Sequence, residues 1–213
     1  MDSLHSSDKN SPKVFCIGRN KTGTTSMSRA LTILGYRVAP QRDGQDLIFC
    51  WSQRNFMPII DFCRDYGAFQ DAPFSFPYTF QALDAAFPGS RFILTMRRDA
   101  DAWYDSLIRF HKRHFAGQLP SVRQLKATKY GHKGTAWDSQ SLVFNIDEKT
   151  LYDRRVYKEQ YDLHNAVVLD YFRHRPNDLL TMNLEEGRNW EQLCEFLGRP
   201  IPSVQFPQTN KTK

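Results

Sequence analysis

The feature that most constrains the fold of this chain is the stretch 13–35, in which an apolar run, a short polar loop and an amphipathic segment follow one another. The run 14–17 is typical of a strand buried in a parallel sheet. The loop 18–23 carries two cationic side chains, those of Arg19 and Lys21. A buried strand that turns directly into a helix begins a β-α-β unit, so the stretch predicts an α/β fold.

The amphipathic segment that follows the loop is predicted to be a helix. Thr24 and Thr25 are suited to cap its start, and Gly35 is suited to end it. Apolar side chains recur between them at helical spacing. The unpaired N–H groups of a first helical turn and the helix dipole both favour a bound anion. The stretch therefore predicts a cradle for a phosphate group.

Predicted strands alternate with predicted helices along the rest of the chain. The strands are 36–39, 67–71, 91–96 and 178–182, and the helices are 56–66, 76–86, a segment around Trp103, 151–174 and a segment at 190–197. This alternation predicts a three-layer α/β/α fold with a central parallel sheet covered on both faces. Ligands of such sheets bind at the carboxyl ends of the strands.

The chain of 213 residues is long enough for one sizeable core. Residues 1–12 are polar and lack the apolar stretch of a secretory signal peptide, so they are predicted to form a disordered tail. Residues 13–213 are predicted to form a single α/β domain. Within it, residues 116–150 show no sustained hydrophobic periodicity, which indicates an irregular or helical insertion that serves as a lid or acceptor-binding segment.

Composition narrows the classes of function. Hydrophobic residues make up 40% of the chain and charged residues 24%, as in ordinary globular domains, and no apolar run is long enough to span a membrane. The four cysteines lie far apart without disulfide or zinc spacing, which predicts reduced thiols and a cytoplasmic protein. The net charge is +6, but the basic residues are dispersed and not interleaved with aromatics. A pocket for a small polyanion explains them, and no nucleic-acid partner is predicted.

The order of residues in the loop argues against a magnesium-dependent triphosphate site. That site has the pattern GxxxxGK[ST], in which a lysine follows the second glycine and the next hydroxyl holds magnesium. Here Lys21 precedes Gly23 and no GK[ST] occurs in the chain, so no metal is predicted. Lys21 is suited to place a positive charge near a leaving phosphate, and Gly23 allows close backbone approach. The hydroxyls of residues 24–26 are further donors.

Three groups of residues resemble one family. The sequence KTGTT at residues 21–25 resembles the 5′-phosphosulfate loop, K-[ST]-G-T-T, of the sulfotransferases that use 3′-phosphoadenylyl sulfate. Arg98 at the end of a predicted strand and Ser106 in the following helix match the spacing of that family's 3′-phosphate site. The C-terminal part, which includes LCEFLG at residues 193–198, is similar to the ending of a short, P-loop-containing branch of the family.

The resemblance implies a P-loop NTPase-like fold and an enzyme that moves a sulfuryl group in line from 3′-phosphoadenylyl sulfate to a hydroxyl or amine. The product of the donor is then adenosine 3′,5′-bisphosphate, and the acceptor is a small molecule or carbohydrate. In this mechanism Lys21 stabilises the charge that builds on the leaving phosphate. The resemblance places the donor against Arg19, Lys21, Thr22, Gly23, Thr24, Thr25, Ser26, Arg98 and Ser106.

The chain departs from the family at the general base. Many cytosolic sulfotransferases have a histidine in a K-T-H-L-P stretch, where this chain has Asp71 in the sequence FQDAP. Asp71 is suited to act as the base if burial raises its pKa, and His111 and His114 are alternatives. The family's glycine-rich clamp R-K-G-x-x-G is absent, and the lysines of residues 126–133 are candidates to replace it.

Two other functions stay open on the sequence. One is a nucleotide-dependent phosphotransferase with Asp71 as a Walker-B-like carboxylate, against which the absent GK[ST] argues. The other is a non-catalytic binding module that keeps the donor pocket and has lost the base. The sequence leaves the acceptor and the oligomeric state open, because acceptor contacts are expected in residues 116–150, where the resemblance is weakest.

Overall fold

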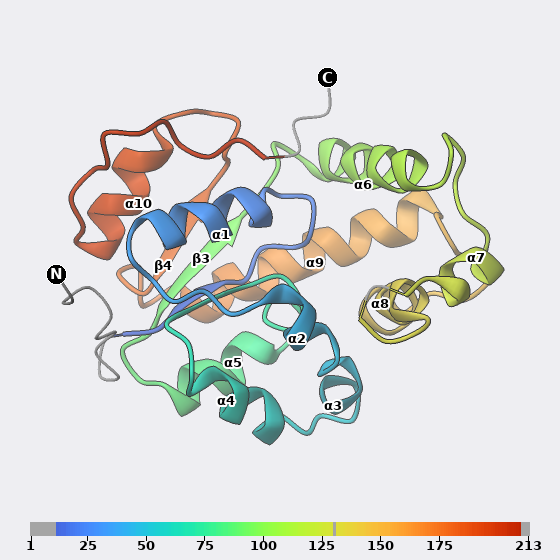
Figure 1. The fold of residues 1–213 in the computed structure, drawn as a ribbon, viewed down its shortest axis with the longest axis horizontal. Coiled ribbons are helices and arrows are strands. Elements are labelled where there is room, and N and C mark those ends of the chain that lie inside the picture. Colours follow the sequence, from blue (N-terminus) through green and yellow to red (C-terminus); the bar gives the residue numbers. More distant parts are fainter. Residues whose placement is uncertain (1–11, 130, 210–213) are drawn as a thin grey trace, which may run out of the picture.

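The fold is built on a parallel sheet whose four strands, in the part of the chain that the structure describes, run in the order β2-β1-β3-β4. The computed structural model describes residues 12–129 and 131–209, so residues 1–11 of the expected tail lie outside it. The strands are β1 (Val14–Cys16), β2 (Ala68–Gln70), β3 (Arg91–Thr95) and β4 (Leu179–Met182). Figure 1 shows helices on both faces of the sheet, which confirms the predicted α/β/α architecture.

Helices occupy most of the predicted positions. They are α1 (Thr24–Ile33), α2 (Gln41–Gln45), α3 (Ile48–Ser52), α4 (Met57–Cys63), α5 (Thr79–Ala86), α6 (Ala100–His114), α7 (Val122–Ala127), α8 (Thr135–Phe144), α9 (Arg154–Phe172) and α10 (Asn189–Leu197). The predicted strand 36–39 is wrong, because only a single bridge joins Val38 to Ala68 before Pro40 begins the next helix. None of the helices described is both long and apolar enough to cross a membrane.

Alternation of side chains along the strands gives the sheet two different faces. Phe15, Phe69 and Phe92 stand on one face, where ring centroids lie 4.8 Å apart for Phe15–Phe69 and 5.5 Å apart for Phe15–Phe92. Helices α5, α6 and α9 pack against this face. Val14 and Ala68 stand on the other face, which α1 and α10 cover. Each buried phenylalanine contributes about 1.5–3 kcal/mol, so the aromatic face is a main source of stability.

The position of β1 in the sheet determines where a ligand can bind. β1 pairs in parallel with β2 on one side and with β3 on the other. The chain therefore runs from β1 to one neighbour and then crosses to the opposite side, which creates a crevice beyond the carboxyl end of β1. The polar loop 18–23 follows β1 at this point.

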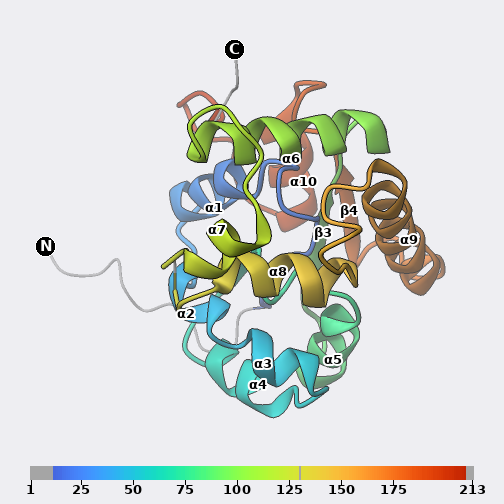
Figure 2. The ribbon, with the colours of Figure 1, turned by 90° about the vertical axis from the view of Figure 1, so that its right-hand side faces the viewer.

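Residues 116–150 contain two helices, so the insertion is more regular than its sequence pattern indicates. α7 begins with a capping box, in which the Ser121 hydroxyl accepts from the Gln124 N–H and the Gln124 side chain accepts from the Ser121 N–H. α8 follows Gly134, and Figure 2 shows α7 and α8 between α6 and the α2–α3 region. Leu125, Thr128 and Ala136 from this segment line the crevice, so the insertion forms one of its walls.

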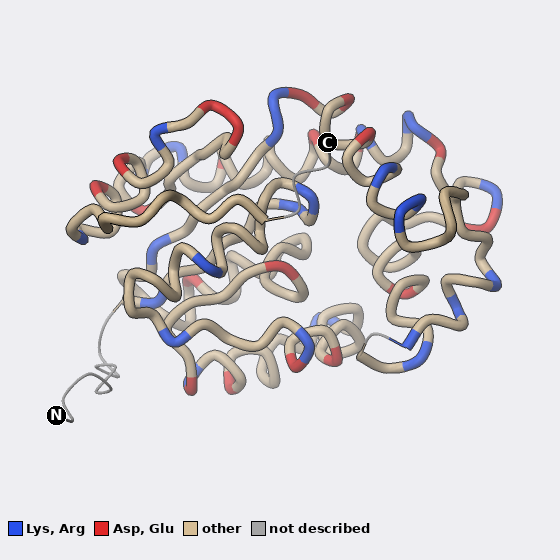
Figure 3. Tube along the Cα trace, turned by 45° about the horizontal axis from the view of Figure 1, so that its top comes forward, with Lys and Arg blue, Asp and Glu red and all other residues tan. Residues whose placement is uncertain are grey.

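Charged residues are spread over the whole fold. Figure 3 shows Lys and Arg along all parts of the chain and mixed with Asp and Glu, not gathered on one face. Specific recognition of an anion therefore depends on the few cations that line cavities.

Candidate functional site

The loop after β1 is held against the end of β3. A Cβ atom at residue 18 would meet the backbone of Thr95, so glycine is required for the two segments to approach. The Thr22 hydroxyl donates to the Arg19 carbonyl at 2.6 Å and lies 2.7 Å from the Thr95 hydroxyl. Its hydroxyl is engaged in these bonds, so Thr22 fixes the curvature of the loop at the edge of a pocket that it also lines.

The start of α1 presents N–H groups to the crevice. Gly23, with φ 106°, is the N-cap residue; no side chain caps the helix, and no acidic residue lies in its first turn. Within the described chain, no hydrogen bond to the N–H groups of residues 23–26 is found. Thr24 and Ser26 are buried beside these groups. This is the arrangement of an anion site, and we call residues 23–26 the anion cradle.

Lys21 stands beside the anion cradle with its ammonium over an aromatic ring. Its backbone has φ 67°, and its Nζ lies 2.9 Å from the centre of the Phe110 ring. Burial lowers the pKa of Lys21 to about 8, while the charge of Asp71 opposes this shift and that of Arg113 adds to it. The ammonium is therefore charged at neutral pH and close to its titration point.

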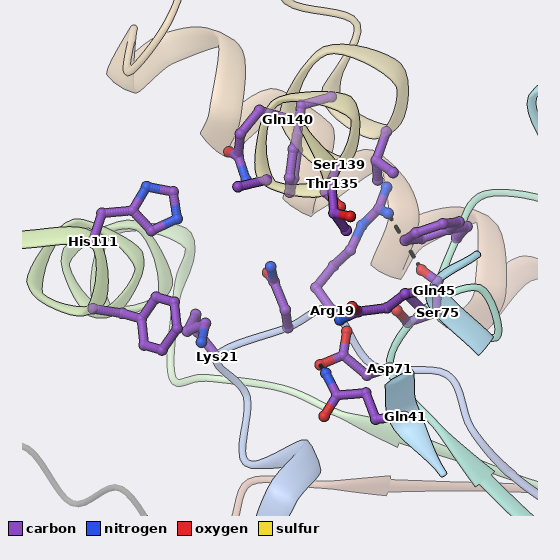
Figure 4. Close-up of a pocket in the computed structure, with 17 residues that line it drawn as sticks. Arg19, Lys21, Gln41, Gln45, Asp71, Ser75, His111, Thr135, Ser139 and Gln140 are labelled. Atoms are coloured by element: carbon purple, nitrogen blue, oxygen red, sulfur yellow. Dashed lines mark hydrogen bonds between the residues drawn. The ribbon is translucent and has the colours of Figure 1, made fainter. Parts of the chain in front are cut away.

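Asp71 comes directly after β2 and also has a positive φ, 61°. Its Oδ2 accepts a hydrogen bond from Gln41 Nε2 at 2.9 Å. Burial raises the pKa of the Asp71 carboxyl, while Lys21 and hydrogen bonds from the Ala72 N–H and the Thr24 hydroxyl oppose the rise. Figure 4 shows Asp71 and Lys21 at one cavity. A raised pKa makes a carboxylate better able to accept a proton from a substrate.

The expected pair of Arg98 and Ser106 does not form, and Arg97 takes the place of Arg98. The Arg98 side chain is 78% exposed and pairs with Asp99 at 2.9 Å. Arg97 instead reaches the loop, where its Nε donates to the Lys21 carbonyl at 2.8 Å and its Nη2 to the Ser106 hydroxyl at 3.4 Å. The reason is the alternation of side chains beyond β3, which directs residue 97 toward the loop and residue 98 away from it.

A pocket of about 400 Å³, which we call the outer pocket, lies between the anion cradle, α6 and the C-terminal segment. Arg97 and Arg109 provide its cationic groups, and Ser106 is one of several hydroxyl residues in its lining. Glu185 forms an ion pair with Arg97 and also borders the pocket. The pocket can therefore bind a second anion beyond the cradle, in competition with the Glu185 carboxylate.

Residues 206–209, which we call the C-terminal strap, close one side of the outer pocket. The Thr209 N–H donates to the Ser26 hydroxyl at 3.0 Å, which ties the strap to α1. The Phe206 and Trp190 rings pack with centroids 4.9 Å apart, and the Trp190 indole N–H donates to the Val204 carbonyl at 2.8 Å. Sequence reasoning missed the role of this segment, because nothing in its composition indicates which surface it covers.

The lysines of residues 126–133 lie away from the outer pocket. Lys126 pairs with Glu148 at 3.5 Å, and its Nζ lies 5.2 Å from the Trp137 ring centre. Lys126 and Lys133 border a separate surface depression. None of these lysines lines the outer pocket, one side of which the C-terminal strap closes, so their replacement of the family's clamp stays a prediction.

Two further cavities continue from the outer pocket. The central cleft, of about 690 Å³, shares Gly23, Arg97 and Ser106 with the outer pocket. The inner chamber, of about 170 Å³, shares Lys21 and Asp71 with the central cleft. The three cavities therefore form one path, and Lys21 and Asp71 lie where the cleft meets the chamber.

Arg19 lines the inner chamber and not the outer pocket. Its side chain is buried, its Nη1 donates to the Ser75 carbonyl at 3.3 Å, and its guanidinium lies 5.4 Å from the Phe144 ring centre. Figure 4 shows this side chain extending from the loop toward α8, away from Lys21 and Asp71. The geometry does not meet the expectation that Arg19 joins the anion cradle, because its side chain leaves the opposite side of the loop.

The two histidine alternatives to Asp71 have different surroundings. His111 is buried at both the cleft and the chamber, and its Nδ1 lies 2.5 Å from the Tyr152 hydroxyl. Burial lowers the pKa of His111 to about 4, and Lys21 and His114 act in the same direction. His114 is exposed, with its Nδ1 2.8 Å from the Phe110 carbonyl. His111 stays a second candidate, although a nitrogen of such low pKa accepts a proton weakly.

Comparison with known proteins identifies the family. The model of the family described as the Sulfotransferase domain matches residues 13–213. No curated protein matches the chain. The matched range includes β1, the loop, the anion cradle and every residue named above at the three cavities. The chain therefore belongs to the sulfotransferase domain family and is a transferase.

Proposed function

We propose that this enzyme transfers a sulfuryl group from 3′-phosphoadenylyl sulfate to a hydroxyl or amine acceptor. One observation carries the proposal: a single path of cavities joins the cationic outer pocket and the anion cradle to Lys21 and Asp71, which lie at the junction with the inner chamber. A donor that is phosphorylated on both its 5′ and 3′ oxygens requires two anion sites. A nucleoside triphosphate requires one extended site and a metal-binding hydroxyl after a GK pair, which this loop lacks.

The residues of the two sites fit this donor. The N–H groups of the anion cradle suit a 5′-phosphosulfate, since a helix start favours tetrahedral anions. Arg97 and Arg109, which line the outer pocket, suit a 3′-phosphate, because a guanidinium offers paired donors to its oxygens. The volume of about 400 Å³ lies within the range common for small-molecule sites, about 300–1,000 Å³. The donor would supply an activated sulfuryl group. Side chains of the protein would supply the general base and the positive charge beside the leaving phosphate.

Asp71 and Lys21 have complementary roles in the proposed transfer. The Asp71 carboxylate takes the proton of the acceptor hydroxyl as the new oxygen–sulfur bond forms, and Gln41 orients the carboxylate through its hydrogen bond to Oδ2. Lys21 stabilises the electron pair left on the phosphate oxygen as the old sulfur–oxygen bond breaks. The proton ends on Asp71 and the negative charge ends beside Lys21.

Ligand-dependent stability tests the donor. Adenosine 3′,5′-bisphosphate at 100 times its Kd should stabilise the protein by ~2.7 kcal/mol. For a chain of this size that is a rise in Tm of about 5–10 °C in a thermal-shift assay. ATP with magnesium at the same concentration should give a smaller rise. Stabilisation by ATP with magnesium alone would overturn the proposed donor in favour of a phosphotransferase.

Replacement of Lys21 tests the mechanism. Lys21→Ala should lower the rate of transfer from ³⁵S-labelled donor by about 10²–10³-fold, because a positive charge beside the leaving phosphate is lost. Binding of adenosine 3′,5′-bisphosphate should change less than the rate does. Lys112→Ala, on the exposed side of α6, is the matched control and should keep the rate. An undiminished rate in Lys21→Ala would contradict the assigned role.

A further inference from the structure

The inner chamber contains a buried cation, Arg19, that forms no ion pair with the described residues. Arg19 is 2% exposed, and burial lowers the pKa of its guanidinium to about 9, so the group stays charged at neutral pH. The Asp71 carboxylate lines the same chamber, but no ion pair joins Arg19 to a carboxylate in the part of the chain that the structure describes. His164, which donates to the Ile17 carbonyl, is held neutral because burial and Arg19 keep its pKa well below its ordinary value. A buried cation of this kind is costly unless a ligand neutralises it.

One edge of the Arg19 guanidinium is suited to bind an oxyanion. Nη1 is directed at the Ser75 carbonyl, and the face of the group lies against Phe144. Nε is fully buried and has no hydrogen-bond partner among the described residues. The N–H of Nε and one N–H of Nη2 point in the same direction, and together they form the fork that accepts both oxygens of a carboxylate or two oxygens of a phosphate.

Other polar atoms of the chamber also have unfilled hydrogen-bonding capacity. The Oδ1 of Asn20 and the Oε1 of Gln45 are buried without a partner in the described structure, and both residues line the chamber. Gln45 is 9% exposed. Buried polar atoms without partners are rare in folded proteins, and here three of them border one cavity. The set of two acceptors and a cationic fork indicates a ligand with an anionic group and additional O–H or N–H donors.

We infer that the inner chamber binds the acceptor through an anionic group, and that the acceptor is a small hydroxylated carboxylate or a related oxyanion. This inference rests on the proposed function, because it takes Lys21 and Asp71 as the reacting end. Asp71 borders the junction of chamber and cleft, while Arg19 reaches the α8 side of the chamber (Figure 4). An anion held by Arg19 therefore leaves the rest of the molecule directed toward Asp71.

The size of the chamber limits the acceptor. A cavity of ~150 Å³ accommodates a benzene ring. The chamber of about 170 Å³ is slightly larger, so it fits a benzoate-sized group. This narrows the group that the chamber holds, from small molecules and carbohydrates in general, to a compact anionic one.

Matched pairs of ligands test the inference by binding alone. Isothermal titration would compare 4-hydroxybenzoate with its neutral isostere 4-hydroxybenzamide, and the smaller glycolate with glycolamide, each with and without adenosine 3′,5′-bisphosphate. We expect at least one carboxylate to bind about tenfold more tightly than its amide, as a charge-assisted pair requires. A third probe, 4-hydroxyphenyl phosphate, shows whether the fork prefers a phosphate to a carboxylate. Equal affinity of each anion and its neutral isostere would overturn the inference.

Three variants connect this preference to Arg19. Arg19→Gln should remove the preference for the anion and leave binding of adenosine 3′,5′-bisphosphate within about twofold of wild type. Arg98→Gln removes an exposed arginine outside the cavities and should keep the preference. Ser139→Asp places a carboxylate in the chamber lining and should abolish anion binding while raising Tm, because it neutralises Arg19 internally. If Arg19→Gln does not fold, Ser139→Asp decides the question.

The outcomes separate this inference from the proposed function. If adenosine 3′,5′-bisphosphate does not bind while the anion preference depends on Arg19, the donor proposal fails and the chamber assignment stands. If the bisphosphate binds and the enzyme transfers sulfate equally well to neutral and anionic acceptors in both wild type and Arg19→Gln, the inference fails and the proposed function stands.

Discussion

At the scale of single residues, Lys21 and Asp71 set the expected pH dependence. Asp71 must be deprotonated to act as base, so kcat/KM for the donor should fall as pH drops through its raised pKa. Lys21 must be protonated, so kcat/KM should fall again as pH rises above about 8, well below the ordinary lysine value. The charged and titratable groups that face Lys21 are Asp71, Arg113 and His111. A pH profile of initial rates measures both limbs.

Variants of Lys21 and Asp71 show which residue causes each limb of the pH profile. Lys21→Arg should move the alkaline limb above about pH 10, because a guanidinium keeps its proton there. Asp71→Asn should lower the rate by about 10²–10⁴-fold and remove the acid limb. An alkaline limb that stays near pH 8 in Lys21→Arg would show that another group causes it. A full loss of rate in His111→Gln with an active Asp71→Asn would transfer the base role to His111.

The ion pair between Arg97 and Glu185 gives a second prediction at this scale. Glu185 is 57% exposed and competes for the guanidinium that faces the outer pocket. Glu185→Gln should therefore tighten adenosine 3′,5′-bisphosphate binding by about two- to fivefold, the range of an exposed pair. Isothermal titration measures the change, and Glu186→Gln next to it is the control. Weaker binding in Glu185→Gln would mean that the carboxylate orients Arg97 instead of competing for it.

The choice between Arg97 and Arg98 shows what the sequence could specify at this scale. Motif spacing identifies Ser106 and a strand-end arginine, but spacing alone does not say which of two adjacent arginines faces the loop. Strand alternation carries that information: Thr95 contacts the loop residue Thr22, so residue 97, two positions on, faces the same side. The partner of Arg98 is the next residue in the sequence. Asp99 is the N-cap of α6, and its partly exposed carboxylate also pairs with the Arg98 side chain.

At the scale of elements, glycine is needed more strictly at the start of α1, at Gly23, than after its end, at Gly35. Gly23 and Gly35 both have positive φ, 106° and 87°, so alanine at either position costs about 1 kcal/mol of backbone strain. A Cβ at residue 35 meets nothing within 4 Å, whereas a Cβ at residue 23 meets the Leu184 side chain, which lines the outer pocket. The two positions therefore form a matched pair of variants.

Gly35→Ala should lower Tm by about 2–4 °C and leave nucleotide binding intact. Gly23→Ala should lower Tm by at least as much and also weaken adenosine 3′,5′-bisphosphate binding by about tenfold, because the displaced Leu184 and the altered N–H groups disturb the anion cradle. Thermal unfolding and isothermal titration measure the two effects. Equal affinities in the two variants would contradict the role assigned to the cradle.

Elements are predictable where a continuous apolar run or a sustained helical repeat of apolar residues is present. β1, β3 and α9 follow directly from apolar runs and from helical spacing. α7 and α8 were harder, because their short helices bury only a few residues each. One signal was present in the sequence: Ser121 followed three residues later by Gln124 is the pattern of a capping box.

At the scale of the whole molecule, the C-terminal strap joins the end of the described chain to its beginning. Phe206 packs on Trp190 and lines the outer pocket, so its ring supports both the fold and the ligand site. Phe206→Ala should lower the free energy of unfolding by about 1–2 kcal/mol, less than for a fully buried ring, and weaken bisphosphate binding by about tenfold. Val204→Ala, at a position 51% exposed, should do neither. Unchanged binding in Phe206→Ala would exclude the strap from the site.

The sheet and its crevice followed from the sequence, but the path of cavities did not. A parallel α/β pattern places ligands beyond the carboxyl ends of the strands, and that region is where Lys21 and Asp71 lie. To predict the inner chamber, one would have to know the direction of the Arg19 side chain. To predict the outer pocket, one would have to know that residues 206–209 return to α1. Both depend on contacts between segments far apart in the chain, which local patterns do not encode.

The surroundings of Trp103 give this enzyme a built-in optical reporter. Its fully buried indole donates to the Asn20 carbonyl in the loop at 2.8 Å and stacks on Tyr161 with ring centroids 4.7 Å apart. The Tyr161 hydroxyl in turn accepts from the Arg97 N–H at 2.9 Å. One chromophore thus contacts the loop directly and the arginine of the outer pocket through a single ring. Its fluorescence emission should shift when either region rearranges, so a titration with no added label can follow occupancy, with Trp103→Phe to separate this signal from that of the other three tryptophans.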